Sequence, residues 1–97
     1  MFKMESDSAG RVVLSGRFDA AEYQAALAFL DRLEQPSIVD LGGLEFIASA
    51  GLRVLMITQK RVKAAGGGLK LVNVPPPVLS ILLFAGFDNI MEVASGG

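Results

Sequence analysis

Residues 38–56 read IVDLGGLEFIASAGLRVLM, and this stretch decides the predicted fold. Together with the preceding Ser37, the residues up to Leu41 predict a short buried strand, and we expect the strand to end at Gly42 and Gly43. Apolar residues then continue into a run of small side chains, after which the pattern becomes helical. A buried strand that leads directly into a helix is the unit of a parallel sheet, so the stretch indicates an α/β protein.

The helix of this stretch is predicted to begin with Ser49 as N-cap and to run to about Ala65, where the glycines of residues 66–68 end it. Glycines that follow a helix and precede a strand have the reverse order of a phosphate-binding loop, so we interpret them as a turn. The helical spacing assigns the core face to five residues: Leu52, Leu55, Met56, Gln59 and Val62.

The rest of the chain alternates in the same way. Asp19 is a good N-cap for an earlier helix, the prolines of residues 75–77 fit a loop that enters the first turn of a later one, and Gly86 fits its end. The pattern predicts further strands over residues 2–5, 11–16, 69–74 and 90–93, and further helices over residues 19–35 and 78–85. We therefore predict one domain over residues 1–97, with a four- to five-stranded, mixed but mainly parallel sheet and three to four helices mostly on one face.

The composition excludes several classes of function. The 97 residues include no cysteine and no histidine, which removes the commonest metal ligands, nucleophiles and general bases. We expect no enzyme activity, metal or cofactor. The net charge is −1 and the basic residues are scattered, which argues against nucleic-acid binding. The longest apolar run, Val78 to Phe87, is shorter than the ~20 residues of a membrane helix, so we expect a soluble, cytoplasmic protein without membrane insertion.

Small residues at the start of the helix form the candidate functional site. They would leave backbone amides open where a partner could approach closely, and Val54 and Ile57 fall beside the core stripe, where they would give the helix a second apolar face. A tight turn with Ser49 as a plain N-cap is the structural alternative, and the pattern alone leaves both interpretations open. The predicted partner-binding residues are Phe46, Ile47, Ala48, Ser49, Ala50, Gly51, Leu52, Arg53, Val54 and Ile57.

Several landmarks in order resemble the STAS domain, the fold of bacterial anti-sigma-factor antagonists. The resemblance covers nearly the whole chain and is carried by LSGRFDA at 14–20, by the strand and loop at 38–47, by ASAGL at 48–52, by residues 66–74 and by Gly86-Phe87. It implies a module that binds a protein partner, either an anti-sigma factor or a serine kinase-like regulator. In such systems the kinase phosphorylates the second hydroxyl residue of the D-S-S/T-G-L signature, and binding is lost.

The signature of this chain differs at that point. Ala48 stands where the family has its acidic residue, and Ala50 occupies the acceptor position, so no oxygen is present there to phosphorylate. Ser49 matches the first serine of the signature, and we expect it to remain unphosphorylated. The hydroxyl-then-alanine order also resembles STAS subunits of lipid-trafficking ABC transporters, which is the alternative function. A small ligand at the helix N-terminus and a homodimer are further hypotheses.

Overall fold

The computed structural model describes residues 1–8, 10–33 and 38–96, which form a five-stranded sheet in the order β1-β2-β3-β4-β5. β1 pairs antiparallel with β2, and the other neighbours are parallel. This confirms the predicted mixed, mainly parallel sheet. In chain order the elements are β1 (Lys3–Ser6), β2 (Val12–Phe18), the 3₁₀ turn η1 (Ala20–Glu22), α1 (Tyr23–Asp31), β3 (Ile38–Ile47), α2 (Ser49–Ala64), β4 (Lys70–Val74), α3 (Pro76–Phe84), the 3₁₀ turn η2 (Phe87–Asn89) and β5 (Glu92–Ser95).

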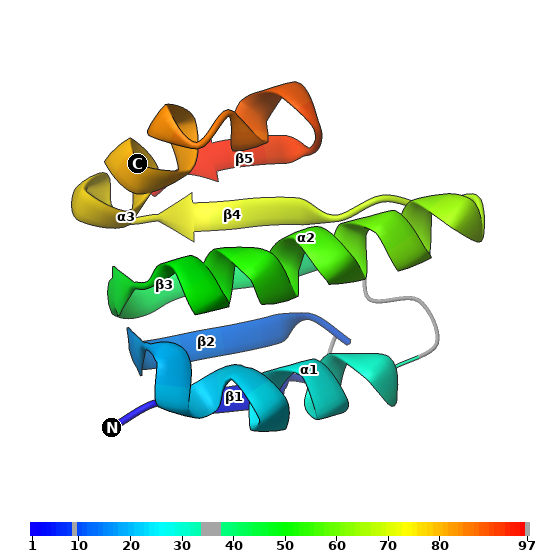
Figure 1. Cartoon of the computed structure of the whole chain (residues 1–97), viewed down its shortest axis with the longest axis horizontal. Helices are drawn as coiled ribbons and strands as arrows, with labels where there is room; N and C mark the ends of the chain where they lie inside the picture. Colours follow the sequence, from blue (N-terminus) through cyan, green and yellow to red (C-terminus); the bar gives the residue numbers. More distant parts are fainter. Residues whose placement is uncertain (9, 34–37, 97) are drawn as a thin grey trace.

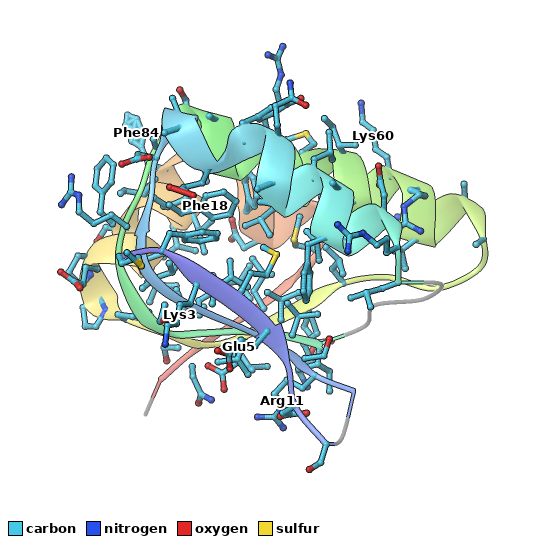
Figure 2. All side chains as sticks on the ribbon, turned by 90° about the horizontal axis from the view of Figure 1, so that it is seen from below. Lys3, Glu5, Arg11, Phe18, Lys60 and Phe84 are labelled. Atoms are coloured by element: carbon cyan, nitrogen blue, oxygen red, sulfur yellow. The ribbon has the colours of Figure 1, made fainter. Side chains whose placement is uncertain are left out.

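The helices lie on one side of the sheet, with α2 between α1 and α3 (Figure 1). Parallel strands need a crossover, and each crossover here places its helix on this same side. Figure 2 shows the two layers edge-on, with Lys60 on the helical side pointing away from the sheet. Of the described helices, none is long and apolar enough to cross a bilayer.

The core fills the space between the sheet and the helices. Along β2, buried Val12, Leu14 and Phe18 alternate with more exposed residues, as expected for a strand with one covered face. Leu30 of α1 and Leu82 of α3 are also fully buried, so both outer helices contribute to the same core as the sheet. The other sheet face has no helix over it (Figure 1).

Three strands differ from the prediction by two residues or more, and the first is β2, which runs to Phe18 instead of ending at Gly16. β3 continues through Gly42 and Gly43 to Ile47, whereas the sequence predicted that these glycines end it. The β2–β3 pairing is irregular here, and a Cβ on Gly43 would lie only 2.7 Å from the Cβ of Ser15. Gly43 therefore permits close strand contact, which is one of the two common meanings of glycine in a strand. The last strand, β5, begins two residues later than predicted, at Glu92 instead of Ile90.

The helix ends agree more closely with the prediction. The Asp19 carboxylate accepts a hydrogen bond from the Ala21 amide at 3.2 Å, although the segment opens as η1 before α1 begins. α3 begins at Pro76, two residues before the predicted start at Val78, so prolines occupy its first turn, where a missing amide hydrogen costs least. Gly86 follows α3 with φ +78°, the left-handed conformation that favours glycine. The predicted end of the first helix, at 34–36, and the predicted start of the next strand, at Ser37, lie outside the described residues.

Candidate partner-docking site

The turn between β3 and α2, residues 46–53, is anchored to the sheet at the carboxyl ends of β2 and β3. The Ala48 amide donates a hydrogen bond to the Phe18 carbonyl at 2.8 Å, and the Leu52 amide donates to the Ala48 carbonyl at 3.1 Å. The first bond joins the turn to the end of β2, and the second begins the helical ladder. The helix start is therefore held by backbone bonds that do not depend on the side chains at the turn.

Ala48 is the N-cap, and the prediction that Ser49 caps the helix is wrong. Ala48 has the extended backbone typical of this position, with φ −89° and ψ 171°, and its side chain makes no capping bond. Ser49 is instead the first helical residue and is exposed. Within residues 1–8, 10–33 and 38–96, its hydroxyl has no hydrogen-bond partner, so helix formation does not use it.

Gly51 is required by the packing inside the domain. A Cβ on Gly51 would lie 2.7 Å from Cγ1 of Ile47 and 3.0 Å from Cγ of Phe18. Gly51 is buried, and Ile47 is only 2 % exposed. Gly51 and Ile47 therefore offer little surface to a partner, and their burial does not favour the prediction that they contact one.

α2 is rotated about its axis relative to the prediction. Val54 is fully buried, contrary to its predicted place on an exposed second face. The neighbouring α1 and η1 pack against α2 and extend its buried face beyond the stripe that meets the sheet. Ile57 is 36 % exposed, as predicted. Leu52 and Met56, assigned to the core by their spacing, are only half-buried.

The remaining predicted residues divide between two faces. Phe46 precedes the buried Ile47, so its side chain lies on the helix-free face of the sheet, where the guanidinium of Arg17 stacks 4.6 Å from its ring centroid. Ser49 and Arg53 are exposed on the helical side, with Ala50 half-buried between them. The structure therefore brings Ser49, Ala50 and Arg53 together and separates them from Phe46.

A shallow depression of about 550 Å³ opens beside the start of α2. Ser49, Ala50 and Arg53 form one wall, and the other is formed by residues that the sequence analysis did not identify: Ala20, Tyr23 and Gln24. These come from η1 and α1, which follow β2. Because parallel strands end at the same sheet edge, the segments after β2 and β3 must meet there. The Asp19 cap, which marks the start of the segment after β2, could have revealed this wall.

The depression offers hydroxyl, amide and guanidinium groups, a set suited to polar contacts with a protein. No cluster of acidic residues in the described segments could hold a metal ion. A partner would meet Ser49 and Arg53 from α2 together with Tyr23 and Gln24 from α1. The exposed groups of the depression come from η1 and the helices α1 and α2.

Comparisons with known proteins identify the family. A family model described as "Mlab, STAS domain" matches residues 1–92. The chain is a STAS domain. This STAS domain is 36 % identical over 78 residues to the Bordetella bronchiseptica protein named "Putative anti-sigma factor antagonist BtrV", a match that covers 79 % of the chain and 67 % of that protein.

Solved structures share the fold of this STAS domain. A Thermotoga maritima protein, described as a "putative anti-sigma factor antagonist", superimposes on this chain with a TM-score of 0.79 at 19 % identity. The match covers 97 % of this chain and 86 % of that protein. The anti-sigma factor antagonist SpoIIAA in its unphosphorylated form gives a TM-score of 0.72 at 20 % identity, over 98 % of this chain and 89 % of that one. These likenesses confirm the STAS fold that the sequence landmarks predicted.

Proposed function

We propose that this STAS domain is an anti-sigma-factor antagonist that acts by binding alone, in the cytoplasm, and has lost the usual phosphorylation switch. Its partner would be an anti-sigma factor or a serine kinase-like regulator, in keeping with the name of its relative BtrV. The observation that carries the proposal is the start of α2. There the exposed Ser49 and Arg53 flank Ala50 at the acceptor position, on a turn fixed to the end of β2.

The absence of a phosphoacceptor determines whether phosphorylation could switch off the binding of such a protein. Phosphorylation adds about −1.5 to −2 charges and three acceptor oxygens, which is enough to repel a close-fitting partner. Ala50 carries no hydroxyl, so the proposed interface stays in its binding form. Control would then pass to the partner, through its abundance or its own state.

The test measures binding of the purified domain to the serine kinase-like regulator of the same genome by calorimetry. Ala50→Asp places a carboxylate in the first turn of α2, where the helix dipole tolerates it, so the fold should be kept. We expect this variant to weaken binding by about tenfold or more. Ala28→Asp adds the same charge at an exposed site on α1 and serves as the matched control.

Equal affinity of the wild type and Ala50→Asp would contradict the proposed surface. The transporter hypothesis is tested in the same way, with the ATPase subunit of a lipid-trafficking transporter as the binding partner. Binding to that subunit, with no binding to the regulator, would replace the antagonist function by the transporter function.

A further inference from the structure

A groove runs along the side of α2 that faces α3 and η2, and it shares only Ser49 and Arg53 with the lining of the depression beside η1. Three adjoining depressions, of about 420, 460 and 240 Å³, share lining residues and make it continuous. We call this the α2–α3 groove. Its main lining residues are Leu52, Met56, Ile57, Ile81, Phe84, Ala85, Phe87 and Ile90, with three basic residues of α2.

The walls of the groove are apolar and open to solvent. Phe84, at the end of α3, is 86 % exposed, an unusual position for a large aromatic side chain. Ile57 on α2 and Ile90 after η2 are 36 % and 39 % exposed. Contiguous apolar surface of this kind on a small soluble domain marks an interaction site.

The charges of the groove all have one sign. Its charged lining residues are Arg53, Lys60 and Lys63, and no acidic side chain of the described residues lines it. These three cations also have no ion-pair partner in the described segments. Lys60 points away from the sheet on the helical side (Figure 2). The groove therefore has an apolar floor with an uncompensated positive edge.

We infer that the α2–α3 groove binds an amphipathic helix of the partner protein that carries acidic residues along one flank. From Leu52 to Lys63, α2 rises about 17 Å, which matches about three turns of a second helix. Apolar side chains at i, i+3 or i+4 and i+7 of the partner would fill the floor, and its carboxylates would face the lysines. The inference rests on the proposed function, because it assigns a chemistry to the partner.

The charge pattern favours this occupant over a second copy of the chain. In a twofold interface the same patch meets itself, so each basic edge would approach another basic edge. Like charges placed together oppose association. An acidic helix instead gains from the same residues.

The probe is a synthetic helical peptide of about three to four turns, with Leu and Phe along one face and Glu along one flank. A control peptide has the same sequence with every Glu replaced by Lys. Fluorescence polarisation measures binding to the whole domain. We expect the Glu peptide to bind about tenfold or more tightly than the Lys peptide. Two variants of the domain should each weaken binding of the Glu peptide by a similar factor: Phe84→Ser, and the double variant Lys60→Glu with Lys63→Glu.

Leu83→Ser is the matched control, because Leu83 is a half-exposed apolar residue of α3 outside the groove lining. Equal binding of the two peptides, or equal loss in Phe84→Ser and Leu83→Ser, would overturn the inference. So would sedimentation with phosphatidylserine vesicles that depends on Phe84, or a dimer in analytical ultracentrifugation that Phe84→Ser dissociates.

Ala50→Asp separates the two proposals. It should weaken binding of the regulator, and it should weaken binding of the Glu peptide much less than Phe84→Ser does, because Ala50 lines the depression and not the groove. If the regulator binds the wild type and Phe84→Ser equally well, the groove inference fails and the proposed function stands. If the regulator does not bind while the Glu peptide does, the proposed partner fails instead.

Discussion

Gln59 joins three parts of the fold through one buried side chain. Its Oε1 accepts a hydrogen bond from the Leu69 amide at 2.7 Å, and its Nε2 donates to the Ile90 carbonyl at 2.6 Å. These bonds connect α2 to the residue before β4 and to the segment between η2 and β5. One partner is a donor and the other an acceptor, and the amide satisfies both by placing its oxygen toward Leu69 and its nitrogen toward Ile90.

Gln59→Glu keeps the size of the side chain and replaces the donor by an oxygen. At pH 7 the variant loses the bond to the Ile90 carbonyl, about 1 kcal/mol, and places a carboxylate against that oxygen in a site that is only 6 % exposed, about 2 kcal/mol more. The expected loss is therefore about 3 kcal/mol, out of a stability of about 5–15 kcal/mol. The melting temperature should fall by roughly 12–24 °C.

The loss should depend on pH in a defined direction. Burial and the Ile90 carbonyl raise the pKa of the new carboxyl above its value of about 4.3 in the unfolded chain. Below that pH both states are protonated, and the acid can donate to the carbonyl, so the variant should approach wild-type stability. As the pH rises through the folded pKa, this stability is lost.

Urea unfolding followed by circular dichroism, at pH 4 and pH 7, measures the effect. Gln24→Glu is the control, because Gln24 is exposed on α1 and the chemical change is identical; it should change stability by less than about 0.5 kcal/mol. A Gln59→Glu protein within about 0.5 kcal/mol of the wild type at pH 7 would refute the reasoning. So would an equal loss at both pH values.

Three further changes test the interior and the helix start. Thr58 is fully buried, and among the described residues its hydroxyl has no partner, so Thr58→Val should stabilise the domain by about 1 kcal/mol in urea unfolding; a loss would reveal a hidden partner. Gly51→Ala forces a Cβ against Ile47 and Phe18, which costs about 1–3 kcal/mol, offset by about 1 kcal/mol of helix propensity, so thermal unfolding should show a net loss. A more stable variant would contradict that packing. Ala50→Ser restores a hydroxyl at the acceptor position, so incubation with the regulator kinase and ATP should add phosphate to this variant and not to the wild type; mass spectrometry that finds it on wild-type Ser49 would contradict the assignment.

Local chemistry explains the parts of the fold that were predictable. Proline at the start of α3 and Gly86 at its end act within one helical turn, so the sequence marks these boundaries directly. The sequence landmarks shared with the STAS family were likewise enough to predict the fold. The absence of a side-chain oxygen at Ala50 is also visible in the sequence without coordinates.

The side of α2 that is buried depended on contacts distant in sequence. Helical periodicity identifies neighbouring apolar stripes and does not say which one a second helix will cover. Packing by α1 and η1 buried Val54 and left Leu52 and Met56 partly open. That rotation, together with the end of α3 at Phe84, produces the α2–α3 groove. The sequence by itself determined the order of the elements and the absence of a hydroxyl at Ala50, while only the packing of elements far apart in the chain decided which side of α2 stays exposed.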